Sequence, residues 1–203
     1  MKSIKFIGAA ALLVSLSISA TAGLLKTDGG VELEIFSTND IIPNGSGEEY
    51  NIGANVTYDG FFTLAKYTFL GKEAGFINQF NVGSEQLKNT DAVGSSFTVS
   101  NLGAPLGVDQ VLDFNFYSEN VSAGVTNGAN NPLGSPQSFA VILDYTLNGN
   151  FYDAVLLFDD SGADQDDNHD DMIVGVNVYV PEPGSLALLG LGLAGLGISR
   201  RQK

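Results

Sequence analysis

The apolar residues of this chain come in short runs, without the wide stripes of amphipathic helices. In residues 31–36 (VELEIF) apolar residues alternate with glutamates, which is the period of a strand with one wet face. The runs are bounded by Gly, Asn, Ser and Thr, which favour turns. Between the two ends of the chain the pattern predicts eight strands, at residues 31–36, 51–58, 61–70, 96–99, 111–117, 139–146, 154–158 and 172–180.

Turn chemistry separates two pairs of these runs. Asp59 and Gly60 separate one pair, and Asn148 and Gly149 separate another; these residue types accept the positive φ of tight hairpin turns. Residues 121–137 are mostly Gly, Asn, Ser, Ala and Pro, which predicts a long loop suited to functional contact. Short strands at regular spacing predict an all-β fold, an antiparallel β-sandwich of jelly-roll-like type.

The N-terminal end has the three-part layout of a secretory signal peptide. Lys2 and Lys5 precede an apolar run at residues 6–16. Small side chains that fit a peptidase pocket follow, and they end at Ala20 and Ala22. The run is shorter than the roughly 20 residues of a spanning helix, which disfavours a permanent anchor. We therefore predict export and cleavage by signal peptidase after Ala22.

The C-terminal end carries a second pattern. Pro181, Glu182 and Pro183 precede an apolar stretch at residues 186–198, and the two prolines oppose a helix around the glutamate. As a helix the stretch would be about 20 Å long, short of the roughly 30 Å hydrocarbon core, so length alone favours a buried core helix. A basic cluster after it favours a membrane segment with a cytoplasmic end instead. This cluster comprises Arg200, Arg201 and Lys203.

Pro-Glu-Pro, an apolar helix and a basic tail together resemble the PEP-CTERM sorting domain, and the resemblance covers only this end of the chain. It implies that the tail anchors an exported protein transiently in the inner membrane until an exosortase processes it near Pro181, Glu182 and Pro183. The product then reaches the cell surface or the extracellular space. The family is associated with bacteria that make exopolysaccharide and biofilm, which implies extracellular polysaccharide as a partner. The chain then comprises a signal peptide (1–22), an all-β extracellular domain (23–180) and a sorting signal (181–203).

The predicted extracellular domain is strongly acidic. The whole chain has 23 Asp and Glu against 9 Lys and Arg, a net charge of −14, and only four lysines lie in the domain. Such a field repels phosphate backbones, so nucleic acid is not expected as a partner, whereas divalent cations are attracted. The chain has no Cys, so neither disulfides nor thiol chemistry contribute.

The densest chemistry lies in residues 159–171, where seven of thirteen residues are aspartate, between two predicted strands that we expect to be neighbours. Such clustering costs repulsion unless water solvates the carboxylates or a cation neutralises them. Asp164, Asp166 and Asn168 stand at alternate positions, as in the first half of a calcium loop. Asp170 or Asp171 would complete the set, and we take Asp170 as the fourth ligand. The Gly and Glu of an EF-hand are missing. The sequence leaves two readings open: bound Ca²⁺, or a solvated acidic hairpin without an ion.

Catalysis is not expected. His169 is the only histidine, and a lone histidine among carboxylates is expected to be exposed and passive, not a ligand. The chain has no Trp, and no pair of carboxylates stands out as a glycosidase pair.

Together with the exopolysaccharide link that the resemblance implies, these observations favour a structural role in the exopolysaccharide layer. The alternative is a glycan- or calcium-binding adhesion module that uses loop 121–137 or exposed tyrosines, although aromatic residues at strand spacing more often belong to the core. A secreted glycan hydrolase is the least favoured reading. The tyrosines considered are Tyr58, Tyr67 and Tyr117.

Overall fold

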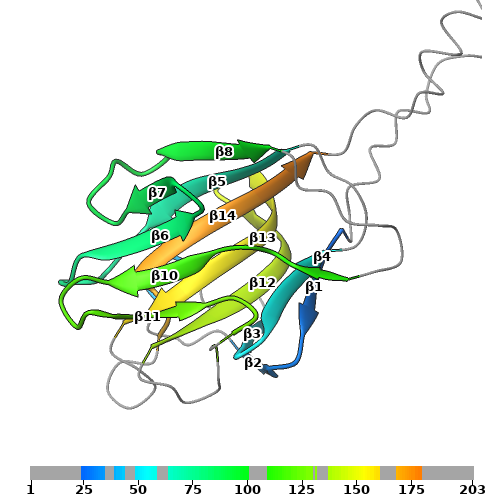
Figure 1. The fold of residues 1–203 in the computed structure, drawn as a ribbon, viewed down its shortest axis with the longest axis horizontal. Coiled ribbons are helices and arrows are strands. Elements are labelled where there is room, and N and C mark those ends of the chain that lie inside the picture. The colour runs from blue at the N-terminus through cyan, green and yellow to red at the C-terminus, as the bar shows by residue number, and fades with distance from the viewer. Residues whose placement is uncertain are drawn as a thin grey trace, which may run out of the picture.

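A computed structural model gives the fold of the chain (Figure 1). Every described strand pairing is antiparallel, and the described elements are all strands, so the predicted all-β class is confirmed. The strands form two layers, with one large sheet behind two small ones. The structure describes residues 24–34, 39–43, 49–58, 64–100, 109–129, 131, 137–160 and 168–179.

The first layer is a seven-stranded sheet. In order across it lie β2 (Val31–Glu34), β3 (Glu49–Ile52), β12 (Ser138–Leu147), β13 (Asn150–Asp159), β14 (Met172–Tyr179), β5 (Leu64–Gly71) and β8 (Ser96–Ser100). The long strands occupy the middle and the short ones the edges. The last strand of the chain, β14, is therefore an interior strand, paired with β13 on one side and β5 on the other.

The second layer comprises two small sheets that cover the same face of the large one (Figure 1). A four-stranded sheet has the order β11 (Ala123–Thr126), β10 (Asn115–Ser118), β6 (Asn78–Val82) and β7 (Glu85–Lys88). A three-stranded sheet has the order β1 (Leu25–Asp28), β4 (Asn55–Tyr58) and β9 (Gln110–Val111).

Buried Asn127 joins these two small sheets. Its Oδ1 accepts a hydrogen bond from the Val56 N–H at 2.8 Å. Its Nδ2 donates to the carbonyl oxygens of Val56 and Leu112 at 2.8 and 2.7 Å. Because buried backbone groups need partners, this one amide completes the hydrogen bonding where β4 and the chain after β9 meet the end of β11.

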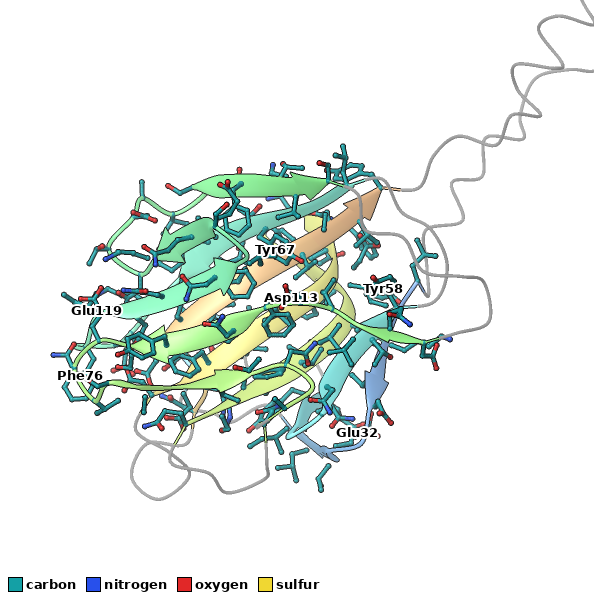
Figure 2. All side chains as sticks on the ribbon, in the orientation of Figure 1. Glu32, Tyr58, Tyr67, Phe76, Asp113 and Glu119 are labelled. Atoms are coloured by element: carbon teal, nitrogen blue, oxygen red, sulfur yellow. The ribbon has the colours of Figure 1, made fainter. Side chains whose placement is uncertain are left out.

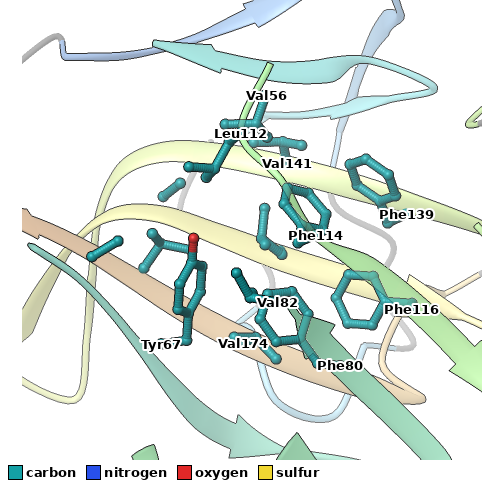
Figure 3. Packing of buried hydrophobic residues seen from close by; sticks show 14 of the residues in the cluster. Val56, Tyr67, Phe80, Val82, Leu112, Phe114, Phe116, Phe139, Val141 and Val174 are labelled. Atoms are coloured by element: carbon teal, nitrogen blue, oxygen red, sulfur yellow. The ribbon is translucent and has the colours of Figure 1, made fainter. Parts of the chain in front are cut away.

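The core between the layers is rich in aromatic rings (Figure 3). The Phe80 ring lies 5.5 Å from Phe114 and 5.0 Å from Phe116, measured between ring centroids. Phe116 stacks flat on Phe158 of the large sheet at 4.8 Å, and Tyr67 lies 5.2 Å from Phe80. Since aromatic side chains bury the largest apolar areas, these contacts hold the two layers together.

The other face of the large sheet is also covered. Ile42 is fully buried and belongs to a second apolar cluster with Tyr50, Leu157 and Ile173. Because β13 is covered on both faces, its residues 154–158 are all apolar and all buried. This explains why that run shows no alternation in the sequence.

The hairpin between β12 and β13 has the predicted tight turn. Leu147 pairs with Asn150, and between them Asn148 and Gly149 have φ values of 50° and 80°. Two consecutive residues with positive φ are typical of a type I′ turn, whose twist matches the flanking strands. The other predicted turn, at residues 58–61, includes positions outside the described residues.

Two predicted strands are each divided between two sheets. The run 51–58 breaks after Ile52, so its first part lies in β3 of the large sheet and its second part in β4 of a small one. Gly53, with φ of 73°, allows the backbone to turn at this corner. The run 111–117 is likewise divided between β9 and β10. The hydrophobic pattern continues through a segment that passes from one sheet to another, so the sequence alone does not show where the strand breaks.

Four strands lie where none was predicted: β1, β6, β7 and β11. In β6 the buried residues alternate with amides such as Gln79 and Asn81. Asn is depleted in strands and common in turns, so this pattern does not predict a strand. The loop predicted over residues 121–137 is wrong for residues 123–126, which form β11.

Several predicted features lie outside the described residues. Among the residues that are described, no helix is long and apolar enough to span a membrane. The features outside are the cleavage residues Ala20 and Ala22, the motif Pro181, Glu182 and Pro183, the basic tail Arg200, Arg201 and Lys203, and the predicted ligands Asp164 and Asp166.

Candidate functional site

The acidic loop connects β13 to β14, which pair with each other as predicted. Its described ends contain four carboxylates. Two of them, on Asp159 and Asp170, belong to fully buried residues, and Asp160 is 2% exposed. A fully solvated hairpin is therefore wrong for these residues. We call the four residues Asp159, Asp160, Asp170 and Asp171 the acidic cluster.

Amide side chains hold one half of the acidic cluster. The Asp160 N–H donates to Oδ2 of Asp171 at 2.7 Å, and the Asp160 carboxylate accepts from Nδ2 of Asn78 at 2.6 Å. The Asp160 carbonyl oxygen accepts from Gln137 at 3.1 Å. The amide nitrogens of Asn78 and Asn89 both lie 3.5 Å from the Asp171 carbonyl oxygen. Side chains from β6 and from the end of β7 thus take the place that basic residues often fill beside carboxylates.

Asp170 connects the other half to two distant segments. Its Oδ2 accepts from the Asp40 N–H, and its carbonyl oxygen accepts from the Glu73 N–H, both at 2.8 Å. The neighbouring Asn168 carbonyl oxygen accepts from Nδ2 of Asn39 at 2.8 Å. Oδ1 of that asparagine accepts from backbone N–H groups two and three residues further on. The loop therefore pins residues 39–42 and the start of the β5–β6 connection to the end of the large sheet.

His169 is fully buried, so the expectation of an exposed histidine is wrong. Its Nε2 lies 3.0 Å from Oγ of Ser138, at the start of β12, and its ring centroid lies 5.6 Å from that of Tyr50. The distance would suit a nucleophile and its base, but a substrate could not reach a hydroxyl that is fully enclosed. The contact packs the acidic loop against β12.

Burial raises the pKa of two carboxyl groups in the acidic cluster. The pKa of Asp171 rises to about 7, first because burial disfavours the charged form and then because the other cluster aspartates repel it. The pKa of Asp170 rises to about 6, mainly through burial, with further repulsion from Glu73 and Asp40. The backbone hydrogen bonds to these carboxylates lower both values but do not offset the burial.

Two lysines form ion pairs away from this cluster. Lys26 pairs with Asp109 at 3.0 Å, and Lys88 pairs with Glu119 at 2.8 Å. The Asp160 N–H therefore balances the charge of the Asp171 carboxylate only in part, as the raised pKa of this group indicates. A divalent cation is the other means by which clustered carboxylates are stabilised.

Two of the four predicted calcium ligands, Asn168 and Asp170, lie in the described part, and both are buried. Oδ1 of Asp170 is enclosed without a hydrogen-bond donor. Within that same part of the chain, no group of three or more His, Asp or Glu side chains is arranged to hold a metal ion. Calcium binding therefore depends on Asp164 and Asp166 and stays a prediction.

The asparagines that hold the acidic cluster were missed by the sequence analysis. Asn78 contacts a carboxylate 82 positions further along the chain, and Asn39 reaches a carbonyl 129 positions away. The only local signal is a single asparagine beside a strand end, which is equally typical of an ordinary turn.

Two of the three tyrosines considered as exposed binding residues are buried. Tyr67 is fully enclosed and Tyr58 is 7% exposed, and both lie between the layers (Figure 2). Only Tyr117 is partly exposed. The core interpretation is therefore confirmed for Tyr58 and Tyr67, and their role as a binding platform is wrong.

Comparison with known proteins gives one family match. Residues 180–201 match the family described as PEP-CTERM protein-sorting motif. Neither the characterised proteins nor the solved structures that were compared with the chain include a match.

Proposed function

We propose that the β-sandwich of this chain is a non-catalytic structural component of the exopolysaccharide layer. The premise is the PEP-CTERM protein-sorting motif at residues 180–201, since a chain with this motif is exported, transiently anchored in the membrane and sorted by exosortase. The family match is the observation that carries this proposal. The net charge of −14 supports it, because a strongly negative surface keeps a matrix protein soluble and hydrated.

The non-catalytic part of the proposal is supported by the surroundings of the reactive groups. His169, the only histidine of the chain, is enclosed against Ser138. The carboxylates of Asp160 and Asp170 are occupied by amide and backbone donors that tie strands together. These contacts serve to hold the strands and loops of the fold together.

We further propose that the acidic loop binds Ca²⁺ through Asp164, Asp166, Asn168 and Asp170. The raised pKa values in the acidic cluster and the enclosed, unpartnered Oδ1 of Asp170 support this proposal. An ion there would stabilise β14 directly before the sorting motif.

The sorting and matrix roles are tested in the native host. The intact chain is compared with a variant in which Pro181 and Pro183 are replaced by Ala and with a strain that lacks exosortase. We expect the native chain to leave the inner membrane and to fractionate with extracellular polysaccharide. Both changes should leave an unprocessed inner-membrane form. Unchanged processing in both would contradict the role of the motif, and a processed chain free of polysaccharide would contradict the matrix role.

Calcium binding is tested by titration calorimetry and thermal unfolding of the mature protein, first stripped with EGTA and then returned to Ca²⁺ or Mg²⁺. We expect a saturable Ca²⁺ signal and a higher melting temperature. Replacing both Asp164 and Asp166 by Asn should abolish both effects, whereas Asp91→Asn in an exposed turn should not. An equal response in the double variant would refute the site.

A calcium- or glycan-binding adhesion module is the second candidate function. The observation that favours it is the outer face of the four-stranded sheet, which is lined with amide side chains.

A further inference from the structure

The outer face of the four-stranded sheet carries an ordered set of amide side chains. In its strands Phe80, Leu87, Phe116 and Val125 point inward and are buried, so the alternate residues point away from the core. We call these outward residues the amide face. They are Gln79, Asn81, Gln86, Lys88, Asn115, Tyr117, Gly124 and Thr126, with Glu119 beside them.

The strand register arranges the amide face in two parallel rows. Each row crosses all four strands, which spans about 14 Å at the usual strand spacing. The first row reads Gln86, Asn81, Asn115 and Thr126, and the second reads Lys88, Gln79, Tyr117 and Gly124. The first row is therefore uncharged, and the second places one aromatic ring next to an amide.

Hydrogen bonds within the amide face fix its side chains in position. The Gln86 amide nitrogen donates to Oε1 of Gln79 at 2.7 Å and to Oδ1 of Asn81 at 2.8 Å. Asn81 in turn donates to Oδ1 of Asn115 at 3.0 Å. Gln79 donates to Glu119. Because the side chains are already ordered, a ligand that binds them loses less conformational entropy.

These bonds leave donors and acceptors available to a ligand. A primary amide has two N–H donors and a carbonyl acceptor. Among the residues that the structure describes, the amide nitrogen of Asn115 and the amide oxygen of Gln86 make no hydrogen bond, and Asn81 uses only one of its two N–H groups. The face thus offers donors and acceptors side by side, which is the combination that matches vicinal hydroxyl groups.

Tyr117 supplies the one aromatic surface of the amide face. It is partly exposed, and its direct cross-strand neighbours are Gln79 on one side and Gly124 on the other. A Cβ at Gly124 would lie 2.2 Å from the Phe116 carbonyl oxygen, so no side chain can stand there. Gly124 therefore adds no side chain over the tyrosine ring. A partly exposed ring next to amides suits the apolar face of a sugar.

The charge of the amide face sets it apart from the rest of the chain. Its one lysine, Lys88, is paired with Glu119, so the face has no net charge on a chain of net charge −14. An acidic polysaccharide would be repelled by the surrounding field and would find no free cation here. A neutral polyhydroxylated chain meets no such penalty.

We propose that the amide face binds a neutral polysaccharide, with the amide row bonding its hydroxyl groups and Tyr117 stacking against a sugar ring. The inference rests on the proposed matrix role and names the class of glycan that the domain would hold. It uses an uncharged surface that is separate from the acidic cluster.

The test measures binding of the mature protein to three neutral polysaccharides, a soluble β-1,3-glucan, dextran and a galactomannan, with alginate as the acidic comparison. We expect saturable binding to at least one neutral polymer and none to alginate. Tyr117→Ala and Asn115→Ala should each weaken it about tenfold, while Tyr117→Phe retains it. Thr98→Ala, on the exposed edge strand β8, is the matched control, and unfolding curves confirm that each variant folds.

Binding of none of the three neutral polymers, or binding that Tyr117→Ala and Asn115→Ala leave unchanged, would overturn the inference. Its failure can be told apart from failure of the matrix role. A protein that fractionates with the matrix of its host but binds no neutral polymer keeps the matrix role without this surface. A protein that binds through the amide face but is absent from the matrix loses the matrix role and keeps the inference.

Discussion

Asp171 gives a direct test of how the acidic cluster is balanced. Its carboxylate is partly buried and lies beside other aspartates, so its charged form is disfavoured in the folded chain. Asp171→Asn removes the charge but keeps a side-chain oxygen to accept the hydrogen bond from the Asp160 N–H. Without calcium, we expect this variant to be more stable than the native chain at high pH and equally stable at low pH.

The magnitude follows from the raised pKa of Asp171, from 3.8 to about 7. At about 1.4 kcal/mol per pKa unit, the shift sets an upper limit of about 4 kcal/mol. Solvent screening of a partly exposed, coupled group lowers the expected effect to about 2 kcal/mol. Below the unfolded pKa both states hold the proton and no penalty arises. As the pH rises from about 4 to about 7, the unfolded chain releases the proton first, so the native chain loses stability.

The assay is thermal unfolding followed by circular dichroism at pH 4 and pH 8 in EGTA. Two kcal/mol corresponds to a melting temperature higher by about 4–8 °C for a domain of this size at pH 8. Millimolar Ca²⁺ should remove most of the difference, because a bound cation stabilises the native carboxylate. Asp28→Asn, at the exposed end of β1, is the control and should change nothing. A gain that is equal at both pH values, or absent at pH 8, would refute the reasoning.

Two further predictions concern packing. Asn127→Ala leaves the buried Val56 N–H and the Leu112 carbonyl oxygen without this side-chain partner and should cost about 3 kcal/mol in chemical unfolding; a loss below about 1 kcal/mol would contradict that role. Gly175→Ala places a Cβ 2.4 Å from the Tyr152 ring, and this clash should cost about 3 kcal/mol of unfolding free energy. Gly149→Ala meets no atom within 4 Å, so it should cost only about 1 kcal/mol, because alanine disfavours the φ of 80°. Equal losses in the two variants would contradict this distinction.

The sequence predicts strands well where burial determines the residue types. The strands of the sheet centre, β12, β13 and β14, are long apolar runs, and each was predicted within a few residues of its observed bounds. The strands β6 and β7 were missed because their wet face is lined with amides that bond to one another. That stabilisation exists only after the strands pair, so no local propensity reports it.

In the candidate site, too, the features set by the local sequence were predictable, and those set by contacts with distant residues were not. The concentration of aspartate and the pairing of its flanking strands were predictable from the sequence. The burial of His169 was not, because it results from Ser138 and Tyr50, which approach from other strands of the sheet. The asparagines around Asp160 and Asp170 were likewise hidden, since their partners lie far along the chain.

The interior position of β14 determines how the domain responds to tension. This strand is bonded along most of its length to β13 and β5, and it leads directly to the sorting motif. A pull on the C-terminal end acts along the strand axis, so it loads both ladders of hydrogen bonds in shear and at the same time. An edge strand would instead peel away one bond after another. While the C-terminal end is tethered, the load on the domain therefore falls on an interior strand that is bonded on both sides.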